Sequence, residues 1–334
     1  MNGFIESTGN ISYVAAKDID CIIASNRTRI IDIVYDTYNN YYAGSAINLG
    51  TFSLKFDEIP NARINALPAS ISGDTNIAGM KWVSSFPDNT KKNMQRASAL
   101  IILNSMETGY PRVILDGTRI SSARTAASAV LSAKLLNPQK KFKKSTFYGG
   151  GILNRDIFDF FISDKWCLGE TNVVDLDSNC KNKFDEYIRN QRIDYKNSEH
   201  TTSQHELISL ATSALNPWYD QDINSKQIIL HVSLRDLKPK LLHKVNNIVD
   251  DIKLATSSNT SLDLYNRENC DAGNIYNLDA IEKKLIDFDK PSVVAAFGMG
   301  ILDLAVSNFI VNIAEKENKL KEIDGMLSNM VRWE

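Results

Sequence analysis

The stretch that decides the fold is Ser145-Thr146-Phe147-Tyr148-Gly149-Gly150-Gly151-Ile152-Leu153-Asn154. A short β-prone run ends in three glycines, and a helix-forming segment follows. In a dinucleotide-binding unit, the first glycine permits a tight turn and the second lets backbone N–H groups approach a pyrophosphate. The helix then directs its positive end at the phosphates. The sequence therefore predicts a cofactor site at Gly149, Gly151, Ile152 and Leu153, although an ordinary loop is the alternative for the triplet alone.

Two side chains beyond this turn qualify the prediction. Asn154 stands where the G-x-G-x-x-G pattern has its third glycine, so we expect weaker helix–strand packing or a shifted cofactor. Asp175 lies 24 residues after Gly151 (175 minus 151), close to the usual spacing of about 20. A carboxylate there accepts ribose hydroxyls and repels a 2′-phosphate, which favours NAD over NADP. Asp177 is a second candidate for this role, and turn formation is the alternative for Asp175.

The segment around the turn alternates predicted strands and helices. Strands are predicted at residues 146–148, 172–176, 207–211, 227–232 and 247–249. Helical segments lie between several of them, as βαβ units require. Residues 131–294 are therefore predicted to form a Rossmann-type α/β domain with a doubly wound parallel sheet.

The first part of the chain, residues 1–130, has a different pattern. Residues 18–42 carry apolar side chains at helical spacing, whereas residues 46–115 are mostly strand-like. Thr108-Gly109-Tyr110-Pro111 predicts a turn, and Ser121-Ser122 predicts the N-cap of a helix that runs to Leu136. We expect an α+β domain with a mixed sheet. A last helix at residues 298–319, within residues 295–334, is expected to pack back on it.

Bulk composition excludes several classes of protein. The length of 334 residues suggests about two domains. A formal charge of -2 predicts no general attraction to nucleic acid. Residues 293–313 are the most apolar stretch, but Asp303 interrupts it, which favours a buried helix over a membrane span. Residues 1–10 lack the basic start and apolar run of a secretory signal.

The cysteines and histidines suggest neither disulfides nor a metal site. Cys21, Cys167, Cys180 and Cys270 are scattered, which predicts free thiols and a cytoplasmic location. The four histidines, at positions 200, 205, 231 and 243, lack metal-ligand spacing, so no bound metal is expected.

Residues 81–124 are cationic, with seven basic and three acidic side chains, or +4, in a chain of charge -2. Arg124 lies in the first turn of the helix predicted from Ser121. A cation opposes the helix dipole there unless an anion binds, so the turn resembles a carboxylate or phosphate receptor. Lys81 stands between Met80 and Trp82 on a predicted strand. If those apolar neighbours face the core, Lys81 points into a cleft, where it could bind a carboxylate or polarise a carbonyl or imine. A surface arginine and a solvated lysine are the alternatives.

Several segments together resemble the ornithine cyclodeaminase/mu-crystallin family over residues 46–314. They are Met80-Lys81-Trp82-Val83, Phe86-Pro87-Asp88-Asn89, the turn at Thr108 and Ser122-Ala123-Arg124-Thr125-Ala126-Ala127. Other segments are similar to the branch of N-(2-amino-2-carboxyethyl)-L-glutamate dehydrogenases. These are Arg63-Ile64-Asn65-Ala66-Leu67-Pro68, Asn93-Met94-Gln95-Arg96-Ala97-Ser98, Ser233-Leu234-Arg235-Asp236 and Gly298-Met299 leading into Asp303-Leu304.

The resemblance implies an NAD-dependent enzyme that is a homodimer built through its first half. Lys81 and Arg124 would hold a substrate carboxylate, with Lys55, Arg63 and Arg96 as further cations. Lys81 and Asp236 would be catalytic, Asp236 handling protons near the reacting amine. The cofactor would lie across a cleft, with its nicotinamide ring near Lys81, Arg124 and Asp236. Further cofactor contacts are implied at Thr125, Thr212, Ser213, Ser233 and Gly298.

The implied reaction is NAD-dependent oxidative hydrolysis of a small anionic amino acid, N-(2-amino-2-carboxyethyl)-L-glutamate, to L-2,3-diaminopropionate and 2-oxoglutarate. The product would supply a siderophore or nonribosomal peptide pathway. One alternative is an ornithine or lysine cyclodeaminase or a ketimine reductase. The other is a non-catalytic, nucleotide-binding protein like mu-crystallin. For Asp236 itself, capping of a helix that begins at Leu237 is the alternative role.

Overall fold

A computed structural model of the 334-residue chain describes residues 9–191, 205–256, 259–268 and 273–328. His200, Cys270 and most of the segment 1–10 lie outside these described residues. The chain divides into two compact units. Unit 1 comprises Met1–Arg124 and Met299–Glu334, and unit 2 comprises Thr125–Gly298. The boundary predicted after residue 130 falls within α3 (Gly117–Leu136), the helix in which the chain passes from unit 1 to unit 2.

Unit 1 is built on an eight-stranded mixed sheet, as expected. Strand β1 runs parallel to β7, and the other pairs are antiparallel. In hydrogen-bonded order the strands are β15 (Leu320–Ile323), β1 (Ile11–Val14), β7 (Pro111–Asp116), β6 (Ala97–Asn104), β5 (Ile77–Ser85), β4 (Arg63–Ile71) and β2 (Ala46–Asn48), with β3 (Phe52–Lys55) also paired to β4.

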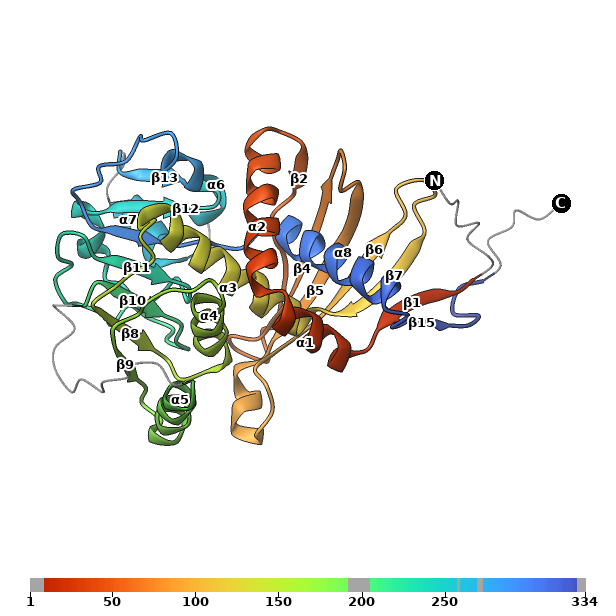
Figure 1. Cartoon of the computed structure of the whole chain (residues 1–334), viewed down its shortest axis with the longest axis horizontal. Helices are drawn as coiled ribbons and strands as arrows, with labels where there is room; N and C mark the ends of the chain where they lie inside the picture. Colours follow the sequence, from red (N-terminus) through yellow and green to blue (C-terminus); the bar gives the residue numbers. More distant parts are fainter. Residues whose placement is uncertain (1–8, 192–204, 257–258, 269–272, 329–334) are drawn as a thin grey trace. The chain divides into compact units, whose positions relative to one another are not determined.

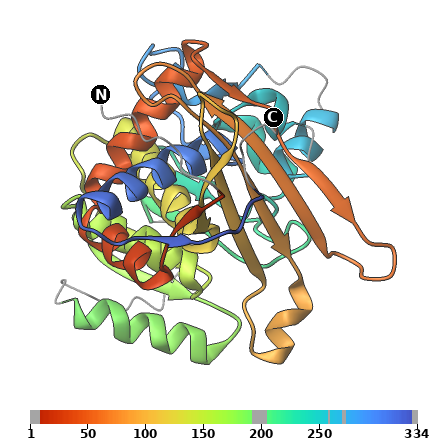
Figure 2. The same cartoon turned by 90° about the vertical axis from the view of Figure 1, so that its right-hand side faces the viewer.

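One face of this sheet is covered by helix α8 (Gly300–Lys316), which contacts β4, β5 and β6 (Figures 1 and 2). Gly300 allows this close approach, because a Cβ there would lie 2.9 Å from the carbonyl oxygen of Leu67. We call this side the covered face and the opposite side the open face. Most side chains of α8 are buried, as predicted for a core helix. Within the described residues, no helix is long and apolar enough to cross a membrane.

The predicted helix at residues 18–42 is two helices, α1 (Ala16–Ser25) and α2 (Arg27–Tyr42). The break is at Asn26, whose backbone leaves the helical region at φ -129 and ψ 20. Its side-chain amide donates to the carbonyl oxygen of Ile22 at 2.8 Å. Asparagine competes for backbone hydrogen bonds in this way and thereby ends helices. A short 3-10 helix, η1 (Pro87–Lys92), connects β5 and β6.

Unit 2 contains the predicted doubly wound sheet, with seven strands that are all parallel. Their order is β13 (Ile275–Asn277), β12 (Asn246–Val249), β14 (Ser292–Val294), β11 (Ile228–His231), β10 (Leu207–Leu210), β8 (Lys144–Tyr148) and β9 (Glu170–Val174). All five predicted strands are present. The two that were not predicted, β13 and β14, have three residues each, too few to show a pattern.

The chain order reverses between β8 and β10, because β9 lies on one side of β8 and β10 on the other. In open α/β sheets, ligands bind outside the carboxyl ends of the strands at such a switch point. The glycine turn follows β8, and Thr212 follows β10 closely. The topology therefore puts both predicted cofactor segments at the switch point.

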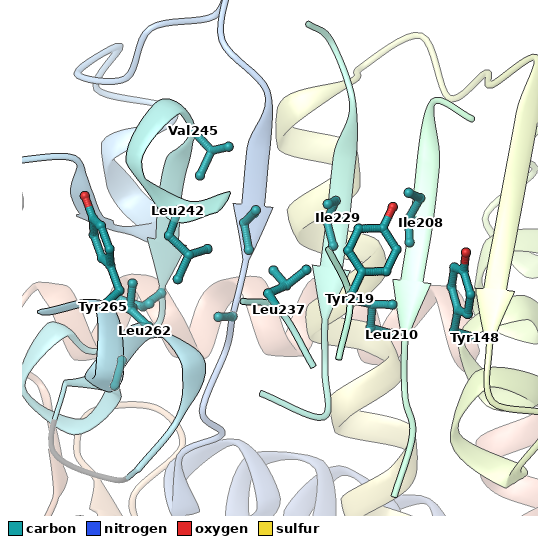
Figure 3. Close-up of a cluster of buried hydrophobic side chains, with 14 residues drawn as sticks. Tyr148, Ile208, Leu210, Tyr219, Ile229, Leu237, Leu242, Val245, Leu262 and Tyr265 are labelled. Atoms are coloured by element: carbon teal, nitrogen blue, oxygen red, sulfur yellow. The ribbon is translucent and has the colours of Figure 1, made fainter. Parts of the chain in front are cut away.

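Both faces of the parallel sheet are covered, and most residues of its strands are therefore buried. On one face, Ile208, Leu210 and Ile229 pack with Tyr219 and Leu237 (Figure 3). On the other, Phe147 makes edge-to-face contacts with Phe158 of α4 (Ile152–Ser163) and Phe184 of α5 (Ser178–Asn190). The unit is completed by α6 (Ile252–Ala255), α7 (Ser261–Glu268), η3 (Pro239–Lys244) and η4 (Leu278–Ala280).

Candidate functional site

The glycine turn in unit 2 has the backbone that the sequence predicts. Gly149 has φ +98, and a Cβ there would lie 2.3 Å from the carbonyl oxygen of Ala211, so only glycine fits. Gly150 is similarly restricted, since its Cβ would lie 2.7 Å from the carbonyl oxygen of Cys180. Gly151 precedes α4, and nothing lies within 4 Å of its Cβ position. The backbone at Gly151, Ile152 and Leu153 is thus approachable by an anion at the positive end of α4.

Asn154 strengthens this turn, contrary to the expectation that it weakens the packing. Its side chain is fully buried. The amide donates to the carbonyl oxygens of Tyr148 at 2.7 Å and Gly149 at 2.8 Å. Its oxygen accepts the hydroxyl of Ser209 at 2.7 Å. The side chain therefore ties the turn to β8 and β10, which a glycine at this position cannot do.

Asp175 lies directly after β9 and also braces the turn. Its carboxylate accepts the N–H of Gly150 at 2.5 Å and that of Asp177 at 2.8 Å. A carboxylate has about four acceptor positions, so two remain for other donors such as ribose hydroxyls. Asp177 has a different role, because it caps α5 through the N–H groups of Asn179 and Cys180. These hydrogen bonds lower the pKa of Asp177.

A second group in unit 2 surrounds the buried carboxylate of Asp236. Thr212 Oγ1 and Ser233 Oγ donate to its two oxygens, one each. Trp218 Nε1 donates to Oδ1 at 2.9 Å. His231 Nε2 lies 3.3 Å from Oδ2 and accepts the backbone N–H of Asp236 at 3.0 Å. Ser213, next to Thr212, is exposed.

These contacts determine the charge of Asp236. Burial alone would raise its pKa, but the neighbouring imidazole of His231 and the hydroxyls of Ser233 and Thr212 hold the pKa well below its ordinary value. The group is therefore an ionised acceptor at neutral pH and a weak base. The helix-capping alternative is wrong, because η3 begins at Pro239 and its cap residue is Lys238.

In unit 1, Lys81 and Arg124 meet in one buried cluster with Ser121 and Asp303. The Lys81 ammonium lies 2.6 Å from Asp303 Oδ2, and Arg124 Nε lies 3.1 Å from Oδ1. Both cations also donate to Ser121 Oγ, at 3.1 and 3.3 Å. Burial lowers the pKa of Lys81 to about 8. The charge of Asp303 opposes this shift, and the charge of Arg124 adds to it.

The structure corrects the local reasoning about both cations. Lys81 is on the covered face of the sheet, whereas its neighbour Trp82 is 38% exposed on the open face, which is the reverse of the expected orientation. Arg124 is not in the first turn of its helix. Helix α3 begins at Gly117, where Asp116 Oδ1 accepts the N–H of Thr118 at 2.9 Å. Arg124 is thus about two turns inside the helix, and the dipole argument does not apply to it.

The other predicted substrate cations lie on the same face. Lys55 and Arg63 are cross-strand partners, and Arg63 is in turn opposite Ser85. Cross-strand partners share a face, and Ser85 shares one with Lys81, four residues away on β5. Arg96 joins this group through a 3.3 Å hydrogen bond to Ser85 Oγ. The separation of four positions between Lys81 and Ser85 corresponds to about 13 Å along the strand.

Of the two remaining predicted cofactor contacts, Gly298 is buried and Thr125 is partly exposed. The N–H of Gly298 donates to Asp250 Oδ2 at 2.6 Å, so its donor is already used. Thr125 is the first residue of unit 2, on α3. Within the described ranges, no three His, Cys, Asp or Glu side chains are grouped as metal ligands would be. Cys21, Cys167 and Cys180 are free thiols.

Residues 15–213 match the model of the ornithine cyclodeaminase/mu-crystallin family. The chain belongs to this family. A relative of the chain, N-((2S)-2-amino-2-carboxyethyl)-L-glutamate dehydrogenase of Staphylococcus aureus, is 28% identical over 272 residues, which are 77% of this chain and 80% of the relative. Alanine dehydrogenase of Archaeoglobus fulgidus is 26% identical over 253 residues, 72% of this chain and 73% of the relative.

A solved structure of the same fold is that of Thermococcus litoralis Delta(1)-pyrroline-2-carboxylate reductase in complex with NADH and L-proline. Its TM-score is 0.84 at 21% identity, and the alignment covers 94% of this chain and all of that one. At this identity the likeness establishes the fold. The resemblance to the ornithine cyclodeaminase/mu-crystallin family and the predicted fold class are both confirmed.

Sequence reasoning about this family member missed three residues of the two clusters. Asp303 was assigned no role from the sequence, although it interrupts an apolar stretch and is part of a segment that resembles the family. A lone carboxylate in a buried helix needs a cationic partner, and that signal predicts a cation without saying which one. Trp218 and His231 carried no such signal, because the loop that brings Trp218 to Asp236 has no regular pattern.

Proposed function

We propose that the chain is an NAD-dependent dehydrogenase that oxidises the CH–NH group of an anionic amino acid. The observation that carries the proposal is the set of cations on the covered face of unit 1. Lys81 and Arg124 share one carboxylate, Asp303, and keep one net positive charge while almost fully buried. A buried net charge is costly unless it is paired. This cluster therefore suits the carboxylate of an amino-acid substrate.

The specific reaction we propose starts from N-(2-amino-2-carboxyethyl)-L-glutamate. The glutamate C–H and amine N–H are oxidised to an imine, and water then cleaves the C=N bond. The products are L-2,3-diaminopropionate and 2-oxoglutarate, with one NADH and one proton formed per NAD+ reduced. The substrate has three carboxylates, which fits cations in two groups on one face: Lys81 with Arg124, and Lys55 with Arg63 and Arg96. The relative of the same name adds support at 28% identity.

Unit 2 fits the cofactor in this proposal. NAD+ supplies the hydride acceptor. Gly151 and the start of α4 would hold its pyrophosphate, where the open space beside Gly151 leaves room. Asp175 would accept ribose hydroxyls and disfavour the 2′-phosphate of NADP. Thr212 and Ser233 would act near the nicotinamide end, through the carboxylate of Asp236 that both of them bind.

The other steps are assigned to side chains of this chain. Lys81 and Arg124 fix one substrate carboxylate and so orient the C–H bond. Asp236 faces the reacting amine in this proposal. Its lowered pKa makes it better at stabilising a positively charged imine and directing water than at removing a proton from an ammonium. We further propose a cytoplasmic homodimer whose product supplies a siderophore or nonribosomal peptide pathway.

The test is turnover by the purified chain. With NAD+ and the proposed conjugate, absorbance of NADH should rise, and 2-oxoglutarate should appear in equal amount. Arg124→Ala should raise KM at least tenfold with NAD affinity almost unchanged. Arg112→Ala is the matched control, because Arg112 belongs to the same cationic stretch but is exposed. Turnover of ornithine or lysine in place of the conjugate would point to a cyclodeaminase. NAD binding without any turnover would point to a non-catalytic protein.

A further inference from the structure

The cluster around Asp303 contains two cations and one anion from three different elements. Lys81 comes from β5, Arg124 from α3 and Asp303 from α8. Their exposed fractions are 3%, 8% and 0%. Asp303 gives one carboxylate oxygen to each cation, at 2.6 and 3.1 Å. The carboxylate of Asp303 therefore bridges the ammonium and the guanidinium, and Ser121 Oγ is a second, uncharged acceptor that both cations share.

The unused donors of the cluster match one further carboxylate. A lysine ammonium has three donors and an arginine five. Asp303 and Ser121 take two from Lys81 and two from Arg124. Asp303 contacts Arg124 at Nε, so the Nη1 and Nη2 groups retain the donors for a two-point contact with a ligand. One donor remains on Lys81 and three on Arg124, against about four acceptor positions on a carboxylate.

Charge explains why a buried aspartate is needed in a site for anions. Two adjacent cations without a counter-ion would repel each other in a poorly solvated place. Of the two cations, the lysine is the one that would lose its proton, because arginine does not lose its proton in proteins. Among the described residues, the charges that act on Lys81 are those of Asp303, from α8, and Arg124, from α3. In the described part of the chain, Asp303 is thus the anion that favours the ammonium form of Lys81.

We propose that Asp303 is the counter-ion and positioning residue of the carboxylate site: it holds Lys81 and Arg124 side by side, keeps Lys81 protonated and leaves one net positive charge for one substrate carboxylate. This rests on the proposed function only in assigning that carboxylate to a substrate. At neutral pH the site can then bind a monovalent carboxylate without taking up a proton. An additional carboxylate on the ligand must find other cations.

The first test follows KM against pH in wild type and Asp303→Asn. Lys81 has a pKa of about 8, so the wild-type KM should be flat below pH 8 and rise above it. Asp303→Asn removes the negative charge and the carboxylate hydrogen bond, which are the two effects of Asp303 that raise the pKa of Lys81. The rise in KM should therefore begin at lower pH and approach about tenfold per pH unit, as for one linked proton. Asp303→Glu retains the charge and should keep the wild-type pH profile while lowering kcat. Coincident profiles for wild type and Asp303→Asn would overturn the proposal.

The second test needs no activity and follows the melting temperature against pH. The Lys81 pKa is lowered in the folded state, so the unfolded chain binds the extra proton and stability rises with pH between about 8 and the unfolded value. In Asp303→Asn this window should extend below pH 8. The variant should then melt at a temperature that rises between pH 6 and 8, whereas in wild type Lys81 contributes little slope until the pH approaches 8. Adding Lys81→Met to Asp303→Asn should remove the slope.

The control for charge loss is Asp88→Asn, which breaks the exposed pair of Asp88 with Lys91. It should leave both pH profiles unchanged. A melting temperature of Asp303→Asn that still rises with pH after Lys81→Met is added would mean that a group other than Lys81 titrates. That result would overturn the proposal. Absence of turnover in wild type, with the expected melting slopes, would reject the proposed function but not the charge role of Asp303.

Discussion

At the scale of single residues, Asn154 illustrates how a departure from a motif can be an adaptation. A third glycine would place no side chain between α4 and the sheet. Asn154 instead makes three hydrogen bonds in a fully buried position, two of them to the backbone of the turn. The same turn is held on its other side by Asp175. Two side chains thus fix the loop that the proposed cofactor site requires.

Replacing Asn154 with glycine, which restores the motif, should destabilise the protein rather than improve cofactor binding. The change leaves buried partners such as the Ser209 hydroxyl unpaired, at about 1–3 kcal/mol each, and adds about 1 kcal/mol for glycine in a helix. Chemical denaturation should report a loss of about 3 kcal/mol or more from these terms. Asn182→Gly on the exposed side of α5 is the control for helix propensity alone. A stability equal to wild type would contradict this account.

At the scale of elements, two glycines of the turn between β8 and α4 are needed for different reasons, one for its backbone conformation and the other for the space beside it. Gly149 needs a positive φ and has a carbonyl against its Cβ position, whereas Gly151 has φ -73 and open surroundings. The fold therefore requires glycine at position 149, whereas glycine at position 151 is required by the ligand proposed to bind at the turn.

The two alanine substitutions should therefore differ in kind. Gly149→Ala should lower stability by about 2 kcal/mol or more, because it combines backbone strain with a steric clash. Gly151→Ala should melt within a few degrees of wild type but bind NAD at least tenfold more weakly, because its methyl group occupies the space left for the phosphates. Melting curves and NAD titrations check both. Equal NAD affinity in Gly151→Ala and wild type would move the cofactor away from this turn.

The elements also show what sequence can and cannot predict. The strands of unit 2 could be predicted because each of β8 to β12 contains β-branched, aromatic or other apolar residues and is separated from the next by turn or helical segments. The predicted orientation of Lys81 was wrong for a physical reason. Alternation along β5 shows which side chains share a face of the sheet, but it does not show which face α8 covers. That helix is about 220 positions away in the chain. The start of α3 was misplaced because Asp116, at the end of a strand, provides the capping group, whereas Ser121 only resembles one. Asp303 was missed for the same reason of distance, since its partners are on other elements.

At the scale of the molecule, the open face of the unit 1 sheet is unusually apolar. Phe52, Ala66, Trp82 and Leu100 are consecutive cross-strand partners on β3, β4, β5 and β6. Phe52, Trp82 and Leu100 are 59%, 38% and 51% exposed. A row of large exposed apolar side chains marks an interaction surface. This apolar row on the open face supports the proposal of a homodimer that forms through unit 1.

Replacing Leu100 with aspartate should disrupt that dimer. The new carboxylate would be buried in an apolar interface without a partner, which costs several kcal/mol. Light scattering should then give the mass of one chain for the variant and of two chains for wild type. Met326→Asp is the control, because Met326 is also half-exposed but lies outside the sheet. A wild-type chain that is already monomeric would reject the dimer itself.

The division of the chain has a consequence for its synthesis. Unit 2 is one continuous segment, whereas unit 1 needs both Met1–Arg124 and Met299–Glu334. A chain growing on the ribosome therefore contains all of unit 2 before α8 and β15 have been translated. Unit 2 can complete its folding at that point, whereas unit 1 cannot. Until α8 arrives, Lys81 and Arg124 have no Asp303, and the apolar side of the sheet that it covers is bare. Transiently exposed apolar surface of this kind favours aggregation, so the interval before α8 is translated is the one in which unit 1 is most exposed to it.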